Sequence, residues 1–284
     1  MNVSNKISWE EAVLWYCNQH GNAQAVLDNY FDENVVVAAK RFSKSKEFIE
    51  TLSLLPTKSN SKLLEIGAGR GIASFAFYVN GYSVTAMEPD PSTFVGAGAI
   101  RSLNRETGAK ITVIEDIGEK LPFKDAIFDV VYVRQALHHA RDLQKFLAEI
   151  ARVLVKDGFF LATREHVIDQ ERDLQTFLDS HPLHHLYGGE NAYPLKQYLN
   201  AINSAGLKII KVLAPFDSDI NLFPTSRREI LNKFSQRHGF NLPGFLQQIL
   251  FEYYNRTTHA PGRLYSFLAS KKSVGVILMS HSNH

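Results

Sequence analysis

The chain has 284 residues, of which 45% are hydrophobic, so it can bury a large core, and disordered or fibrous classes are excluded. Lys and Arg total 31 against 29 Asp and Glu, and this small net charge predicts no nucleic-acid partner. No segment approaches the roughly 20 apolar residues of a membrane-spanning helix, and the first residues lack a secretory signal. We therefore expect a cytoplasmic protein without stable membrane association.

The first sixty residues have the periodicity of helices. Ser8 and Glu11 have the spacing of a capping box, which predicts the start of the first helix. Two longer helical patterns follow, at 22–38 and 42–55. These patterns predict a helical N-terminal extension over residues 1–60.

From Leu63 onward, short apolar runs alternate with amphipathic helical patterns, which is typical of a parallel sheet covered by helices on both faces. The predicted strands are 63–66, 83–87, 110–114, 129–133, 158–163, 207–213 and 265–270. The predicted helices are 72–80, 91–108, 143–154, 194–205, 226–238 and 243–256. The expected fold class is therefore α/β: a mostly parallel, seven-stranded sheet flanked by helices, with the N-terminal extension and a helical C-terminal insertion forming a cap.

A glycine-rich turn separates the first predicted strand from its helix: Glu65-Ile66-Gly67-Ala68-Gly69-Arg70-Gly71. Glycines at such a turn let the backbone approach a ligand closely. The dinucleotide fingerprint is G-x-G-x-x-G, whereas here the third glycine comes one residue early. An NAD(P)-dependent oxidoreductase is therefore the weaker alternative, and no triphosphate-binding G-x-x-x-x-G-K-[ST] loop occurs.

Acidic residues stand at the ends of the next two predicted strands. Glu88, followed by Pro89, comes about twenty residues after the glycines, where a carboxylate can accept hydrogen bonds from ribose hydroxyls. Glu115 and Asp116 follow the third strand at the same sheet edge, where a carboxylate can accept a hydrogen bond from an adenine amino group. Each of these residues alone could equally cap a helix or end a strand in solvent. Their order and spacing together point to one bound nucleoside.

These segments together resemble the class I S-adenosylmethionine-dependent methyltransferases, especially the small-molecule group of ubiquinone and menaquinone methyltransferases. The resemblance rests on Leu63 to Ser74, Val84 to Asp90, Glu115 to Phe123 and Phe128 to Asp142. It implies a Rossmann-like fold, S-adenosyl-L-methionine as the cofactor and a small-molecule methyl acceptor. Residues 61–165 would be the cofactor-binding core, and residues 166–284 would contribute a substrate loop, the cap helices and the last strands.

By that resemblance, the cofactor-binding residues are Glu65, Gly67, Ala68, Gly69, Gly71, Glu88, Pro89, Asp116, Ile117, Arg134 and Gln135. Within this set the glycine loop would hold the methionine part and Glu88 the ribose. Asp116 and the backbone of Ile117 would hold the adenine, and the two residues after the fourth strand would lie beside the sulfonium. Asp116 departs from the family pattern, because it precedes Leu121 by five residues where the family has four.

His138 and His139 follow the fourth predicted strand and are the candidate catalytic residues. Methyl transfer from a sulfonium is an in-line displacement, so the protein supplies alignment and, for a hydroxyl acceptor, a proton acceptor. An imidazole suits that task at neutral pH, and we take His139 as the better candidate. The alternative is that one of the two histidines caps the next helix or packs against the cofactor. We expect a hydroxyl oxygen as the acceptor, with carbon and nitrogen left open.

Residues 181–193 are rich in histidine and tyrosine and lie outside the common core. We predict a substrate loop or lid, because its tyrosines offer flat apolar faces and its two glycines allow closure. The candidate substrate residues are His181, His184, His185, Tyr187 and Tyr193. A transition metal held by His181, His185 and Glu190 is an alternative, but loop histidines are more often surface groups, so we expect no metal.

Two further functional hypotheses compete with the methyltransferase. One is the NAD(P)-dependent oxidoreductase, and the other is a non-catalytic S-adenosylmethionine-binding protein that keeps the glycine loop. The intact pair His138 and His139, together with the tyrosine-rich segment, favours an enzyme. The sequence does not determine the oligomeric state or identify the acceptor.

Overall fold

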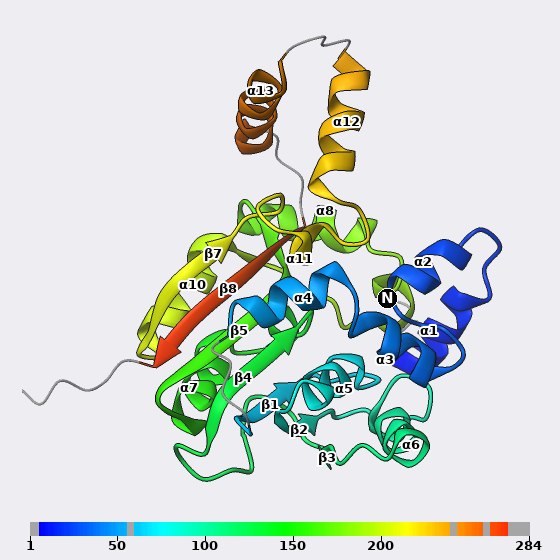
Figure 1. Cartoon of the computed structure of the whole chain (residues 1–284), viewed down its shortest axis with the longest axis vertical. Helices are drawn as coiled ribbons and strands as arrows, with labels where there is room; N and C mark the ends of the chain where they lie inside the picture. Colours follow the sequence, from blue (N-terminus) through cyan, green and yellow to red (C-terminus); the bar gives the residue numbers. More distant parts are fainter. Residues whose placement is uncertain (1–5, 56–59, 239–242, 258–261, 272–284) are drawn as a thin grey trace, which may run out of the picture.

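The computed structural model describes residues 6–55, 60–238, 243–257 and 262–271, and one sheet runs through it (Figure 1). The strands are β1 (Lys62–Ile66), β2 (Ser83–Met87), β3 (Thr112–Ile114), β4 (Phe128–Arg134), β5 (Leu154–Ile168), β6 (Tyr193–Pro194), β7 (Leu207–Leu213) and β8 (Arg263–Lys271). Their order is β3-β2-β1-β4-β5-β8-β7, and the short β6 pairs with β5. Only β8 runs antiparallel to its neighbours. The α/β class and the mostly parallel sheet are thus confirmed.

Helices cover both faces of the sheet. Their bounds are α1 (Trp9–Cys17), α2 (Ala23–Asp28), α3 (Val35–Phe42), α4 (Lys46–Ser53), α5 (Ile72–Val79), α6 (Ala97–Thr107), α7 (Leu143–Val153), α8 (Leu174–Ser180), α9 (His184–Tyr187), α10 (Leu195–Ser204), α11 (Asp219–Leu222), α12 (Arg227–His238) and α13 (Gly244–Thr257). Two 3-10 turns are η1 (Leu137–His139) and η2 (Glu171–Asp173). No helix in these described ranges is long and apolar enough to cross a membrane.

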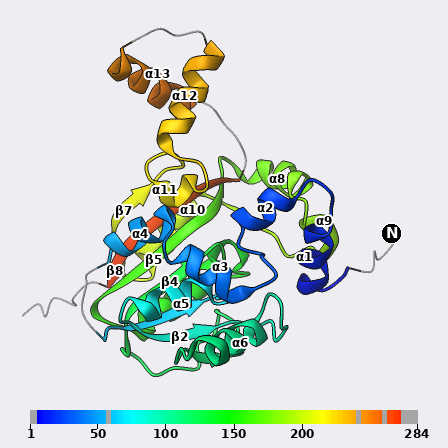
Figure 2. The ribbon, with the colours of Figure 1, turned by 45° about the vertical axis from the view of Figure 1, so that its right-hand side comes forward.

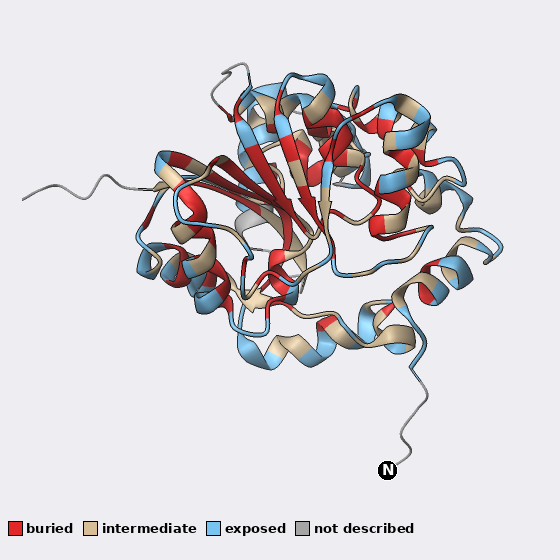
Figure 3. Ribbon diagram, turned by 90° about the horizontal axis from the view of Figure 1, so that it is seen from below, coloured by how far each residue is buried: buried red, intermediate tan, exposed pale blue. Residues whose placement is uncertain are grey.

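Alternate residues along the strands face two separate cores. In β4, Val131 and Val133 pack with α7 and α10, whereas Val130 and Tyr132 pack with the core under α3 to α6. This follows from the strand's two-residue period, which sends neighbouring side chains to opposite faces. Figure 3 shows the strands mostly buried between helices whose outer faces are exposed. The sheet is therefore a rigid layer that holds its carboxyl ends in place.

The predicted elements differ from the observed ones where loops interrupt a pattern. The helix predicted at 22–38 is two helices, because Tyr30 takes a positive φ of 61° and Asn34 caps α3 with its side chain. The helix predicted at 91–108 begins only at Ala97. Helices α8, α9 and α11 and strand β6 were not predicted.

Two helical regions lie at opposite sides of the fold. Helices α1 and α9 lie side by side, and the rings of Trp9 and Tyr187 are 4.7 Å apart (Figure 2). Helices α12 and α13 instead extend away from the body, beyond the sheet (Figure 1). They follow β7 and α11, at the sheet edge opposite β3. The N-terminal helices are therefore the ones placed near the carboxyl end of β1.

Candidate functional site

A cavity of about 770 Å³ lies at the carboxyl ends of β1, β2 and β4. Strand order reverses between β1 and β4, and ligands of open α/β sheets bind at such a switch point. The volume is in the range of small-molecule sites. Its lining includes Trp9, Asn29, Tyr30, Phe31, Glu65, Gly67, Ala68, Gly69, Arg70, Glu88, Pro89, Asp116, Ile117, Arg134, Gln135, His139, Arg141, Lys145 and Tyr187.

The glycine loop turns tightly at the cavity. The N–H groups of Gly67 and Ala68 both donate to the Met87 carbonyl, at 2.9 and 3.1 Å, which ties the loop to β2. Gly67 has a φ of +70°, and a Cβ there would stand 2.5 Å from the Cβ of Ala136. Gly71 does not line the cavity; its φ of +78° opens α5, where a Cβ would press on Ile100. Gly67 is thus required at the site, whereas Gly71 sets helix packing.

Two buried carboxylates stand beside this loop. Glu65 accepts a hydrogen bond from the Ser74 hydroxyl, and burial raises the pKa of Glu65 to about 8. Glu88 accepts hydrogen bonds from the N–H groups of Gly69 at 2.7 Å and Asp90 at 2.9 Å. Burial raises the pKa of Glu88 to about 7. The Glu88 carboxyl group is therefore held at the cavity by hydrogen bonds from backbone N–H groups.

Asp116, Ile117 and Pro89 line the same cavity, as the sequence predicted. The Ile117 N–H donates to the Asp116 side chain at 2.8 Å, so this turn is held by its own carboxylate. The Ile117 side chain is 54% exposed and forms an apolar edge. These residues provide one polar and one apolar contact at the far end from Glu65.

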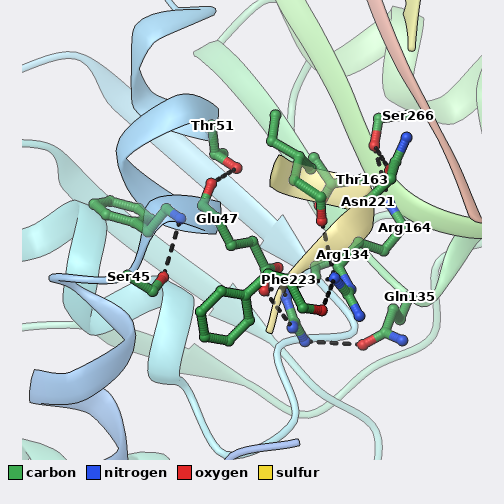
Figure 4. Close-up of polar contacts among 12 residues, drawn as sticks. Ser45, Glu47, Thr51, Arg134, Gln135, Thr163, Arg164, Asn221, Phe223 and Ser266 are labelled. Carbon is green, nitrogen blue, oxygen red and sulfur yellow. Dashed lines mark hydrogen bonds and ion pairs between the residues drawn. The ribbon is translucent and has the colours of Figure 1, made fainter. Parts of the chain in front are cut away.

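Arg134 also lines the cavity, but its charge is paired inside the protein (Figure 4). Its Nε donates to Glu47 at 2.7 Å and its Nη2 donates to the second oxygen of Glu47 at 3.2 Å. Its Nη1 donates to the Gln135 side chain at 3.0 Å. Burial alone would lower the pKa of the guanidinium, but Glu47 raises it above its ordinary value. Glu47 comes from α4, so the N-terminal extension supplies the counter-ion of a site residue.

The two candidate catalytic histidines have different environments. His139 lines the cavity with a 36% exposed side chain, and its Nδ1 lies 2.8 Å from the Gly189 carbonyl. Burial and the neighbouring His138 lower the pKa of His139. His138 is buried, with Nδ1 at 2.7 Å from Glu165 and Nε2 at 3.6 Å from Glu190. Burial opposes its charge, yet the two carboxylates raise its pKa to about 9.

Residues 181–193 fold against the core as α9 and β6, and Tyr187 is the one predicted substrate residue that lines the cavity within the described ranges. The Tyr193 hydroxyl donates to the Ala140 carbonyl at 2.5 Å. His185 is exposed and contacts the Asp179 carbonyl through Nε2 at 2.9 Å. The other predicted substrate residues, His181 and His184, also lie outside the cavity wall. Among the described residues, the structure therefore places Tyr187 of the predicted substrate set at the cavity, and the three histidines and Tyr193 outside its wall.

Several residues of the site could not be recognised from local pattern. Tyr30 and Phe31 reach the cavity because the chain turns between α2 and α3, where a continuous helix was predicted. Glu47 lies on the buried face of α4 beside Phe48. A charged residue on the apolar face of a helical pattern is the one sequence feature that could have indicated its role. Helices α12 and α13 add no described residue to the wall. Among the described residues of the expected cap, those that line the cavity come from the N-terminal region, at Trp9 and 29–31, and from α9, at Tyr187.

The strand order, the cavity at the switch point and the acidic residue after β2 define a nucleotide-binding domain of the Rossmann-like type. Residues 64–162 match the family model described as a methyltransferase domain. Residues 64–162 of this chain therefore resemble a methyltransferase domain. This resemblance argues against the oxidoreductase alternative.

The proteins that are similar to this chain have the names of different methyltransferases. YcgJ of Bacillus subtilis, an uncharacterized methyltransferase, is 30% identical over 156 residues, covering 53% of this chain and 56% of the relative. Sarcosine/dimethylglycine N-methyltransferase of Halorhodospira halochloris is 27% identical over 177 residues, covering 60% and 61%. The fold of the Streptomyces coelicolor geranyl diphosphate C-methyltransferase matches with a TM-score of 0.61 at 12% identity, covering 92% and 97%. The chain thus spans 56% of the length of YcgJ and 61% of that of the sarcosine/dimethylglycine N-methyltransferase.

Proposed function

We propose that this protein transfers the methyl group of S-adenosyl-L-methionine to a small-molecule acceptor. The observation that carries the proposal is that the glycine loop, Glu88 and Asp116 line one cavity at the switch point of the sheet. The site also fits the group by its hydrogen-bonding side chains, because Glu88 and Asp116 line the space and can accept hydrogen bonds from ribose hydroxyls and an adenine amino group. The non-catalytic binding protein remains the competing hypothesis.

The cavity residues divide the work of holding the cofactor. The backbone of Gly67 to Gly69 would contact its methionine part, and Glu88 would accept hydrogen bonds from the ribose hydroxyls. Asp116 with Ile117 would hold the adenine. When bound, the cofactor supplies a methyl group that its sulfonium already activates. The remaining task of the chain is to bind the acceptor, orient it and exclude water.

We further propose that the acceptor is a hydroxyl and that His139 takes its proton. The Gly189 carbonyl can only accept a hydrogen bond, so Nδ1 of His139 carries the hydrogen in this contact. In the neutral ring, Nε2 then has the free lone pair. His138 is unsuited to the task, because both of its ring nitrogens face carboxylates and the residue is only 1% exposed. His139 is the base that the cavity presents.

The rest of the wall favours an acceptor with an apolar or aromatic body. Four aromatic side chains also line the cavity: Trp9, Tyr30, Phe31 and Tyr187. Aromatic faces provide a large contact area with polar ends for orientation. The similar proteins include an N-methyltransferase and a C-methyltransferase, so likeness to them does not select the methylated atom. The choice of oxygen rests on His139.

Two measurements test these proposals separately. Calorimetric titration of S-adenosyl-L-methionine should give saturable binding that Gly67→Arg and Glu88→Ala weaken by at least tenfold, and undiminished binding in both variants would contradict the cofactor site. A panel of acceptors is then screened for a mass increase of one methyl group. With a responding hydroxyl acceptor, His139→Ala should lower kcat much more than cofactor affinity. An unchanged kcat would leave alignment as the only contribution, and binding without any turnover would favour the non-catalytic hypothesis.

A further inference from the structure

Behind Tyr187 the structure brings His166 together with His181 and Glu190, two residues that the sequence had offered as alternative metal ligands with His185. His166 on β5, His181 at the end of α8 and Glu190 after α9 place one ligand atom each within 4.8 Å of one another. The three residues come from separate elements, so the tertiary fold creates the cluster. A partly buried group of this composition has the donor atoms of a transition-metal site.

His166 has the hydrogen bond that orients a metal-binding histidine. Its Nδ1 lies 2.9 Å from the Gly262 carbonyl, which can only accept, so Nδ1 carries the hydrogen and Nε2 keeps a lone pair. Within the described ranges, Nε2 makes no hydrogen bond. Metal-ligating histidines commonly donate their other ring N–H to a backbone carbonyl in this way. The second nitrogen is therefore available to a cation.

His181 presents a ring nitrogen that is buried and unpaired. Among the described residues, no hydrogen-bond partner reaches its Nδ1, although this atom is shielded from solvent. The same atom lies 3.9 Å from an oxygen of Glu190, too far for a hydrogen bond. A buried polar atom without a partner costs free energy, so its position calls for a ligand.

Glu190 is the shared anion of the cluster, and its side chain is 5% exposed. The Tyr187 hydroxyl donates to one of its oxygens at 2.5 Å, which orients the carboxylate as the outer partners of metal-bound carboxylates do. Because Tyr187 lines the cavity, the cluster lies directly behind the cavity wall. An ion held here would fix that wall.

We propose that His166, His181 and Glu190 bind one divalent transition-metal ion, with zinc as the reference ion. Two imidazoles and one carboxylate suit zinc and its neighbours, whereas magnesium and calcium prefer oxygen ligands. Zinc binds nitrogen and oxygen at about 2.0–2.2 Å, so the side chains must close by roughly an ångström. The ion joins β5 to the segment that carries Tyr187, and this role does not depend on the proposed methyl transfer.

A neighbouring set, His138, His139 and Glu190, shares the same carboxylate and is the competing arrangement. His138 already has a carboxylate beside each ring nitrogen, with Glu165 at 2.7 Å and Glu190 at 3.6 Å. His139 lines the cavity; its Nδ1 lies 2.8 Å from the Gly189 carbonyl and its Nε2 lies 4.0 Å from an oxygen of Glu190. The set that includes His166 has the unpaired nitrogen and is therefore preferred.

Metal titration of the full chain tests the proposal. After treatment with a chelator and dialysis, zinc should bind with a stoichiometry of one per chain, and cobalt(II) should give the visible absorption of a low-coordinate nitrogen and oxygen site. The double variant His166→Ala/His181→Ala should lose at least tenfold in affinity and should lack the cobalt spectrum. His185→Gln is the matched control, since that exposed histidine lies outside the cluster, and it should bind as the native chain does.

Thermal unfolding keeps the test independent of catalysis. Saturating zinc should raise the Tm of the native chain and of His185→Gln, but not that of the double variant, because only a folded site with intact ligands gains stability from the ion. Circular dichroism establishes that the double variant is folded. Native-like zinc affinity in the double variant would overturn the proposal. A loss caused by His139→Ala alone would assign the ion to the competing set instead.

Discussion

Glu47, in the N-terminal extension, forms a buried ion pair with Arg134. We predict that its carboxylate contributes strongly to the free energy of unfolding. Glu47 is fully buried, and it contacts the guanidinium through both oxygens, at 2.7 and 3.2 Å. A second guanidinium, that of Arg164, lies 3.9 Å from the same carboxylate. Glu47→Gln removes the negative charge. The guanidinium groups of Arg134 and Arg164 then lose this counter-ion.

The expected loss in the free energy of unfolding is about 3–5 kcal/mol. At a separation near 3 Å and an effective dielectric constant of about 20, the pair's attraction is about 5 kcal/mol. Part of it offsets the cost of desolvating both groups, and removal of one partner from a buried pair costs about 3–5 kcal/mol. The loss therefore comes mainly from the charge that stays behind on Arg134.

Urea denaturation followed by circular dichroism measures this loss directly. Glu33→Gln makes the same charge change at an exposed position and should alter the free energy by no more than about 0.5 kcal/mol. In the double variant Glu47→Gln/Arg134→Met, the two losses should not add, because the uncompensated cation is gone. Equal and small losses in Glu47→Gln and Glu33→Gln would refute the reasoning.

Three other predictions concern the cavity. Affinity for S-adenosyl-L-methionine should fall by up to about tenfold per pH unit below pH 7, because Glu88, with its pKa raised to about 7, is protonated there and loses its carboxylate form. Calorimetry measures this affinity, and the Glu88→Gln variant should give a flatter pH profile. A flat profile of the native chain would contradict the prediction. Gly67→Ala should weaken cofactor binding at least tenfold through its 2.5 Å clash with Ala136, whereas Gly81→Ala, equally left-handed but open, should leave calorimetric affinity unchanged. Trp9→Ala should raise the acceptor KM several-fold in steady-state assays without changing cofactor affinity, and the exposed Trp15→Ala on the same helix should change neither.

The sheet was predictable because its signals are local. Apolar runs of strand length, bounded by turn residues, predicted all the described strands except β6, and the predicted ranges 83–87 and 207–213 match β2 and β7. The carboxyl ends of parallel strands share one edge, so the loop at Gly67 and the carboxylates at Glu88 and Asp116 could be placed together before the structure was known. Strand period and motif spacing were sufficient for this half of the site.

The other half was not predictable, because it depends on pairs that are far apart in the sequence. Glu47 and Arg134 are 87 positions apart, and no local pattern connects a helix of the extension to the end of β4. His166 lies within a strand that was predicted to end at residue 163, so it was not considered beside His181. Contacts between elements set these positions, and a single sequence carries no direct record of such contacts.

The division between the two halves also explains why the family match leaves the acceptor open. The matched segment, residues 64–162, contains the glycine loop and the acidic residues that line the cavity at Glu65, Glu88 and Asp116. The aromatic wall comes from outside it: Trp9 on α1 and Tyr187 on α9. Helix α1 is tied to the core through Glu10, which accepts a hydrogen bond from the Phe94 N–H at 2.8 Å, and α9 through the cluster at Glu190. We therefore expect acceptor choice to depend on how firmly these two attachments hold the rings at the cavity, and changes outside the matched segment to alter specificity without altering cofactor binding.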